Sequence, residues 1–269
     1  MYPHLPRVAC LCPTFNRYPN YGHLLEEAVE SFLRQDYPSD KRTLFILNDT
    51  PGQTIRLADG VAERGNVVVI NDSKRYTSLG QKRNDLVELA YMYMQQDIIL
   101  PWDDDDISLP HRVSQAAHVL GSYTRFWKPV YWNPRRYWYL PSTGLEVPST
   151  LGWGHNCSAM SFRAFRLVGG YQLVSGSEDA LIDISLRKIE EIATIDGLES
   201  LRGKPASWPY IYRWETNPRH LSQGPLGHDQ HYYRIGQEPV QKGEFTINPR
   251  WLSDYSEMVN SYILREQIP

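Results

Sequence analysis

The first half of the sequence alternates short apolar segments with segments whose apolar residues recur at helical spacing. Turn-forming Pro, Gly, Asn and Asp residues bound the short segments, which have the length of buried strands. We predict strands at residues 8–12, 44–47, 67–70 and 97–102, and helices at residues 24–33 and 80–96. This alternation is typical of a mostly parallel sheet flanked by helices. The predicted fold class is therefore α/β.

Polar clusters lie where three of the predicted strands end. Residues 14–17 follow the first strand, residues 48–49 the second, and the aspartates 103–106 the fourth. Ligands of such sheets bind beyond the carboxyl ends of the strands, so we expect these clusters to meet in one crevice. Three converging strand ends are a stronger signal than any single cluster.

The run of four aspartates, Asp103–Asp106, carries the most chemical information. Runs of like charge are usually solvated, but this one directly follows an apolar strand and precedes a helix start near Pro110. Adjacent carboxylates at such a place need positive charge to neutralise them. Hard cations such as Mg²⁺ take one or two protein carboxylates and complete their shell with water and phosphate. The run therefore predicts a metal–diphosphate site at the carboxyl edge of the sheet.

Composition and charge exclude several other classes. The chain has 269 residues and a net charge of −3, so no overall basic field indicates nucleic acid or a membrane surface. Its three cysteines are too few for a disulfide framework, and Cys10 and Cys12 are expected to pack as small apolar residues. The N-terminus lacks the layout of a signal peptide and no run of 18 apolar residues occurs, so we expect a cytoplasmic protein.

Five motifs in order resemble the inverting family 2 glycosyltransferases, which have a GT-A fold. The motifs are CPTFNR, SFLRQDYP, LFILNDT, GQKRNDLVELA and ILPWDDDDISLPHR. The resemblance covers about residues 7–120 and continues through GGYQLVSGSEDALIDISLRK. It implies a Rossmann-like, mostly parallel sheet with a smaller acceptor-side subdomain. It also implies a cytoplasmic enzyme of a bacterial or phage-infected host cell.

The resemblance implies one continuous domain with three parts. Residues 1–120 would bind the nucleotide sugar, and residues 121–215 would bind the acceptor and supply the catalytic base. Residues 216–269 would form a lid and a C-terminal helix. Apolar residues at helical spacing after Trp251 predict that helix, which would either pack back on the domain or mediate a homodimer.

The donor would be a nucleoside-diphosphate sugar, with a UDP-sugar expected first. Asp49 would accept hydrogen bonds from the base, and Arg83 would reach the diphosphate. The full set implied for nucleotide-sugar binding is Thr14, Asn16, Arg17, Asp49, Arg83, Asp103 and Asp104. Each also has an ordinary structural interpretation, such as a turn-forming Asp after a strand.

Asp103 and Asp105 match the D-x-D pair of the family, with Asp105 as the expected direct ligand of Mn²⁺ or Mg²⁺. Asp106 could instead cap the following helix. His220 and His228 are further candidate ligands from the C-terminal part, since imidazole also binds such metals.

Inverting transfer needs a carboxylate that takes the proton of the acceptor hydroxyl. Glu178 and Asp179 open a predicted helix, where acidic residues also serve ordinary capping. The family position favours Asp179 as the base, with Glu178 as the second candidate.

The acceptor is less well specified. Residues 123–140 combine eight aromatic and four basic residues, and two strands joined at Asn133-Pro134 are the structural interpretation. Aromatic rings suit a glycan acceptor, whereas rings interleaved with Arg and Lys also suit DNA, as in phage-type enzymes that glycosylate hydroxymethylated bases. Trp153, His155 and Asn156 are the expected acceptor-binding residues.

Two other classes stay open at this point. A nucleotidyltransferase also needs strand-end carboxylates and metal, but it normally has a Gly-rich phosphate loop where this chain has residues 13–17. A non-catalytic nucleotide-sugar-binding module would keep the fold, although the intact acidic residues favour an enzyme.

Overall fold

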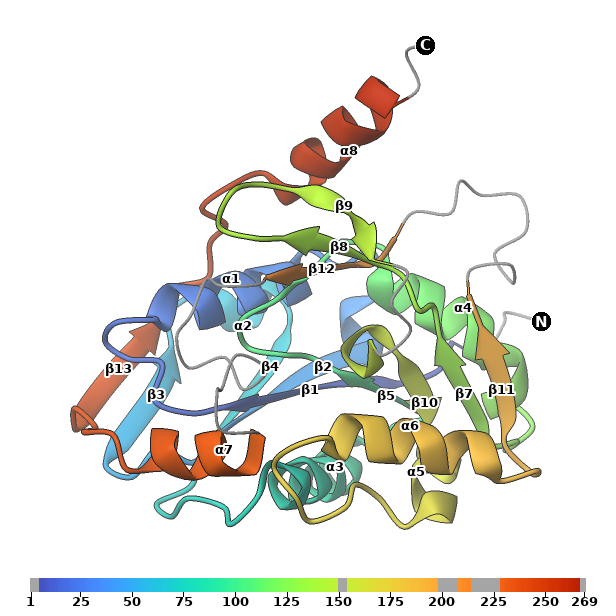
Figure 1. The fold of residues 1–269 in the computed structure, drawn as a ribbon, viewed down its shortest axis with the longest axis horizontal. Helices are drawn as coiled ribbons and strands as arrows, with labels where there is room; N and C mark the ends of the chain where they lie inside the picture. The colour runs from blue at the N-terminus through green and yellow to red at the C-terminus, as the bar shows by residue number, and fades with distance from the viewer. Residues whose placement is uncertain (1–4, 150–153, 198–207, 214–227, 267–269) are drawn as a thin grey trace.

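A seven-stranded sheet lies at the centre of the molecule (Figure 1). The computed structural model describes residues 5–149, 154–197, 208–213 and 228–266. The order across the sheet is β11 (Ala193–Asp196), β7 (Val130–Asn133), β10 (Ala159–Ser161), β5 (Ile98–Pro101), β1 (Val8–Thr14), β2 (Arg42–Asn48) and β4 (Asn66–Asn71). Strand β10 runs antiparallel to both neighbours, and the other neighbouring pairs are parallel. The predicted mostly parallel α/β fold is thus confirmed.

Helices cover both faces of this sheet (Figure 1). One face carries α1 (Gly22–Leu33) and α4 (Arg112–Thr124), and the other carries α3 (Leu79–Met94), α5 (Phe162–Val168) and α6 (Glu178–Lys188). Side chains of β1 alternate between the two cores, as the pleat requires. Cys10 and Cys12 lie in one core and Ala9 and Leu11 in the other, and both cysteines are buried free thiols.

A second sheet lies above the first (Figure 1). Its order is β6 (Ile107–Ser108), β12 (Tyr210–Arg213), β8 (Tyr137–Leu140) and β9 (Glu146–Ser149). The C-terminal helix α8 (Tyr255–Glu266) packs on it through Tyr255 and Val259. Because β7 and β8 belong to different sheets, the expectation that they pair across the turn at Asn133-Pro134 is wrong.

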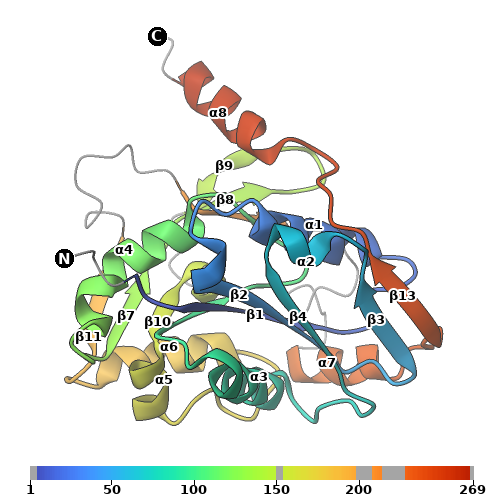
Figure 2. The ribbon, with the colours of Figure 1, turned by 180° about the vertical axis from the view of Figure 1, so that it is seen from behind.

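Two strands distant in sequence form a third, small sheet that was not predicted. Strand β3 (Gln53–Leu57) pairs in parallel with β13 (Gly243–Ile247), as both ribbon views show (Figures 1 and 2). The short helix α2 (Val61–Arg64) follows β3, and α7 (His228–Gly236) precedes β13. Short 3-10 turns occupy Ser39–Lys41 and His155–Cys157. Residues 243–247 near the C-terminus are therefore held against residues 53–57 of the first half of the chain.

Predicted and observed elements of the first half agree to within a few residues. The strand at residues 44–47 extends to 42–48, and the helix expected at 80–96 spans 79–94. Across the described ranges, the helices are too short or too polar to cross a bilayer.

The start of α3 is closely packed around Gly80. Gly80 donates its N–H to the Val174 carbonyl at 3.0 Å, and a Cβ there would lie 1.8 Å from the Gln172 oxygen. We expect Gly80→Ala to destabilise the protein by about 1–3 kcal/mol, because the backbone must shift. Gly121→Ala in α4 is the matched control, since its Cβ would meet nothing closer than 3.9 Å. Thermal unfolding that affects both variants equally would contradict this packing.

Candidate active site

One cavity of about 350 Å³ opens at the carboxyl edge of the central sheet. Its walls come from the ends of β1 and β5, the starts of α3 and α6, the second sheet and α7. Of the residues predicted from the sequence, it is lined by Thr14, Arg17, Arg83, Asp103, Asp104, Asp105, His155, Asn156, Glu178 and Asp179. Two of the three expected strand ends, those of β1 and β5, therefore meet at this cavity, whereas residues 48–49 at the end of β2 do not line it.

The aspartate run links β5 to β6, and each carboxylate has its own partners. Arg17 binds both oxygens of Asp104, at 2.7 and 2.6 Å, and reaches Asp105 at 2.9 Å. Arg83 binds Asp103 at 3.1 Å. Protein cations thus neutralise much of the charge that made this run unusual in the sequence.

Asp106 has a structural role that differs from the expected helix cap. Its carboxylate accepts hydrogen bonds from the Tyr210 hydroxyl at 2.5 Å and the Arg213 N–H at 2.7 Å. Helix α4 begins only at Arg112, so the capping prediction is wrong. Burial, together with the nearby Asp105 and Asp103, raises the pKa of Asp106 well above its usual value. Asp106 fixes the run to β12 and leaves the other three aspartates on the cavity.

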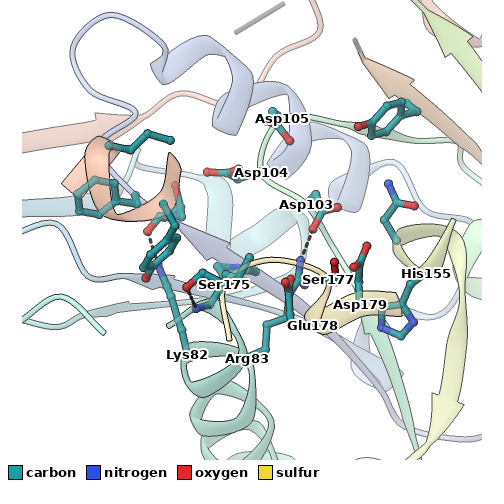
Figure 3. Close-up of a pocket in the computed structure, with 18 of the residues that line it drawn as sticks. Lys82, Arg83, Asp103, Asp104, Asp105, His155, Ser175, Ser177, Glu178 and Asp179 are labelled. Atoms are coloured by element: carbon teal, nitrogen blue, oxygen red, sulfur yellow. Dashed lines mark hydrogen bonds and ion pairs between the residues drawn. The ribbon is translucent and has the colours of Figure 1, made fainter. Parts of the chain in front are cut away.

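Arg83 connects the aspartate run with the start of α6. Its side chain lies between Asp103 and Glu178, and Nε is 3.4 Å from the Glu178 carboxylate (Figure 3). Burial raises the pKa of Glu178 to about 7, although Arg83 opposes the shift. Glu178 can therefore hold a proton near neutral pH.

Asp179 lies beside Glu178 on the same wall of the cavity, across from the aspartate run (Figure 3). One of its oxygens accepts the Ala180 N–H at 2.7 Å, and its side chain is less buried than that of Glu178. Ser177 before it has φ +66° and makes no capping hydrogen bond through its side chain. A left-handed serine at this position is unfavourable, and such backbone strain is common in functional sites.

Asp49 and Asn16 lie behind the cavity wall and do not line it. The oxygens of Asp49 are 2.6 Å from Lys82 Nζ and 2.9 Å from the Tyr76 N–H. Lys82 also binds the Thr14 carbonyl at 2.6 Å and lines the cavity itself. Asn16 takes a left-handed φ of +48° at the turn between Phe15 and Arg17, both of which reach the cavity. Direct contact of Asp49 or Asn16 with a ligand stays a prediction.

The cavity wall near Asp179 contains a buried histidine, His155. His155 lies 2.9 Å from the Tyr171 hydroxyl through Nε2 and 3.2 Å from the Ser158 hydroxyl through Nδ1. Burial lowers its pKa to about 4, although Asp179 opposes the shift. His155 is therefore a neutral hydrogen-bonding group at physiological pH, next to Asn156 and near Asp179.

The aromatic and basic segment 123–140 does not form one surface. Tyr131 and Trp132 are fully buried, whereas Phe126 and Trp127 are exposed at the opposite edge of the central sheet. Arg135 pairs with Asp196 at 3.2 Å. Only Tyr137 of this segment lines the cavity, where its ring meets that of Tyr212 at 5.6 Å. The interleaved pattern thus reflects several separate environments.

Some predicted residues lie outside the described residues. These are Trp153 and His220, and for His228 the structure gives only its backbone position at the start of α7. Conversely, sequence reasoning missed several residues that line the cavity: Phe15, Arg75, Lys82, Tyr137, Tyr212, Tyr232 and Ile235. Phe15 lies within the motif CPTFNR and Lys82 within GQKRNDLVELA, so a motif search could have found these two.

The pKa of Glu178 predicts a specific pH dependence of stability. The unfolded chain loses this proton near pH 4.5, whereas the folded protein keeps it until about pH 7. In this window the folded state therefore binds more protons than the unfolded chain. The contribution of Glu178 to the free energy of unfolding falls as pH rises, by up to about 3 kcal/mol. In urea unfolding from pH 4.5 to 8, wild type should lose stability relative to Glu178→Gln. Parallel curves for the two proteins would contradict the shift.

Comparisons with known proteins show which proteins the chain is similar to. The chain resembles the S. aureus TarS 1–349 structure in complex with UDP-GlcNAc, with a TM-score of 0.56, 13% identity and coverage of 86% of this chain and 65% of that one. Another structure of TarS 1–349 gives a TM-score of 0.53, 12% identity and coverage of 77% and 60%. This chain thus spans under two thirds of the TarS 1–349 chains, and at such low identity the likeness shows the fold.

No curated protein matches the chain. Residues 10–143, about half of the chain, match the family model described as Glycosyl transferase family 2. They include the end of β1, the start of α3 and the aspartate run, which together build one side of the cavity. With these motifs on a matching fold, the chain belongs to glycosyl transferase family 2.

Proposed function

We propose that this protein is an inverting glycosyltransferase that moves a sugar from a nucleoside-diphosphate sugar to a hydroxyl group of a glycan or similar acceptor. The observation that carries the proposal is the arrangement of carboxylates in one cavity. Asp103 and Asp105 face Glu178 and Asp179 across it, with Arg83 between the two groups (Figure 3). Such a site can neutralise a leaving diphosphate on one side and remove a proton on the other.

The donor would occupy the side formed by the nucleotide-binding half, residues 1–120. Lys82 and Arg83 supply positive charge for a diphosphate, and the buried Thr14 hydroxyl has no hydrogen-bond partner within the described structure. An unpaired buried hydroxyl in a cavity wall is a natural contact for a ligand. UDP is the first candidate nucleotide, since the TarS structures of the same fold were determined with UDP and with UDP-GlcNAc.

The carboxylate oxygens available in the cavity suit Mn²⁺ or Mg²⁺, with Asp105 and Asp103 as ligands. No group of three or more His, Cys, Asp or Glu able to hold a metal occurs among the described residues. Two carboxylates are nevertheless what such ions usually take from protein when phosphates and water complete the shell. When bound, the ion would stabilise negative charge on the diphosphate.

Asp179 would act as the base toward the acceptor hydroxyl. It lies on the cavity wall opposite the aspartate run, and in the described structure no ion pair neutralises it. Glu178, by contrast, is buried against Arg83 and has a raised pKa. Its proton and its contact with Arg83 suit a supporting role, in which it holds Arg83 toward the diphosphate.

A glycan fits the acceptor side better than DNA. The rings of Tyr137 and Tyr212 lie beside His155 and Asn156 in the cavity wall, and aromatic faces pack well on sugars. The basic residues that suggested DNA lie elsewhere: Arg125 and Lys128 are exposed at the opposite edge of the sheet, and Arg135 pairs with Asp196. Residues 121–215 would thus supply the acceptor site, and the part from residue 216 onward would close it.

The base assignment is tested by Asp179→Asn. We expect transfer to fall at least about 100-fold, because a positioned general base contributes a factor of this order or more. The dissociation constant of UDP, measured by calorimetry, should stay within about twofold of wild type, because the base acts on the acceptor. Asp40→Asn is the control, since that side chain is 71% exposed. Full turnover in Asp179→Asn, measured with a panel of nucleotide sugars and acceptors, would remove Asp179 from the mechanism.

The metal assignment is tested by thermal stabilisation. We expect Mn²⁺ to increase the stabilisation that UDP gives to wild type, and Asp105→Asn to abolish that increment. Asp104→Asn is the matched control, because Arg17 already binds both of its oxygens. An increment that survives in Asp105→Asn and disappears in Asp104→Asn would move the metal ligand by one residue.

A further inference from the structure

Arg75 is an unusual cation in the cavity wall that no recognised motif includes. It lies in the loop between β4 and α3, and its guanidinium carbon is 3.6 Å from the centre of the Phe15 ring and 4.2 Å from that of Tyr232. Phe15 follows β1, whereas Tyr232 belongs to α7. Arg75 therefore joins two distant parts of the chain by cation–π contacts.

The hydrogen bonds of Arg75 fix its orientation but leave one donor group unused. Nη2 donates to the Tyr232 carbonyl at 2.9 Å. Nη1 is buried and has no hydrogen-bond partner within the described residues. A buried N–H group without an acceptor is unfavourable, and the cost is larger for a charged group. A ligand oxygen at the cavity wall would remove this penalty.

The charged side chains around Arg75 also favour the binding of an anion. Arg75 and Lys82 both line the cavity. Burial lowers the pKa of Lys82, Asp49 opposes that shift, and repulsion from Arg75 adds to it. Asp49 is the anion bound to Lys82, and both of its oxygens are occupied. Asp49 thus compensates the charge of Lys82, whereas no ion pair of Arg75 occurs among the described residues, so an anionic ligand beside Arg75 would be stabilised.

We propose that Arg75 is a donor-binding residue whose Nη1 donates a hydrogen bond to a phosphate oxygen of a nucleoside diphosphate. This inference rests on the proposed function and adds to it a phosphate contact outside the family motifs. The planar guanidinium suits this role, because it is always charged and keeps its face on the aromatic rings while its edge donates.

The same contacts make α7 part of the donor site. Besides the ring of Tyr232, α7 places Gly236 against Arg75, and a Cβ at Gly236 would lie 3.0 Å from Nε. The Tyr232 hydroxyl also donates to the Tyr76 carbonyl at 3.3 Å. A phosphate held by Arg75 would therefore strengthen the position of α7 over the cavity, and a change at Arg75 must be separated from a simple loss of α7 packing.

The experiment compares ligands with and without phosphate. Dissociation constants of UDP, inorganic pyrophosphate and uridine are measured by calorimetry for wild type, Arg75→Met and Arg75→Lys. We expect Arg75→Met to weaken the binding of UDP and of pyrophosphate about tenfold or more, because a charged hydrogen bond is lost. The dissociation constant of uridine should stay within about twofold of wild type. Arg75→Lys should recover part of the pyrophosphate affinity. Arg163→Met, an exposed arginine of α5, is the matched control and should bind all three ligands like wild type.

The other outcomes separate the hypotheses. Equal weakening of uridine and UDP in Arg75→Met would overturn the phosphate contact and leave Arg75 as a support for Phe15 and α7. Unchanged UDP binding in that variant would also overturn it, while the proposed function stands. If wild type binds neither UDP nor pyrophosphate, the proposed function fails together with this inference.

Discussion

The ion pairs that hold the aspartate run are the interaction on which the rest of the site depends. Arg17 comes from the end of β1, Arg83 from α3, and the groups that hold Asp106 from β12. Buried carboxylates are tolerated only when such partners compensate for their lost hydration. The run can therefore form only when both sheets and α3 have come together. Assembly of the fold and assembly of the site are one event.

These pairs also distinguish two possible reasons for a cation at the aspartate run, stabilising the fold and binding the diphosphate, which the sequence alone does not separate. In the sequence, four adjacent carboxylates indicate a metal, yet in the structure arginines already neutralise much of their charge. A cation bound at Asp105 would therefore serve the diphosphate more than the fold. Arg213 also helps to hold the run without a bound cation, since it donates to the Asp105 carbonyl through Nε and pairs with Glu27 at 2.5 Å.

Local pattern predicted well which residues at the strand ends meet at the cavity. Thr14, Arg17, Asp103 and Asp105 follow strands whose apolar runs are plain in the sequence, and parallel strands bring their ends to one edge. Arg83 and the acidic pair of α6 were found through their motifs. The sequence was less informative on the separate roles of the four aspartates, because Asp106 is held by Tyr210 of β12, more than 100 residues away in the chain.

Long-range pairing explains what sequence reasoning missed. Tyr212 and Tyr232 reach the cavity from strands and helices whose partners are distant in the chain, so no spacing rule finds them. Segment 123–140 looked like one basic and aromatic surface because its residues are adjacent in sequence. In the fold its members enter the core, the cavity wall and the far edge of the sheet, since β7 and β8 belong to different sheets.

The pairing of β13 with β3 limits how far α7 can travel. Six residues, 237–242, join Gly236 to β13. Even fully extended, this connection reaches only about 25 Å. Because β13 pairs with β3, the C-terminal end of α7 stays within that distance of the start of β13. The local concentration of α7 near Arg75, which Tyr232 contacts, is thus set by a short covalent tether.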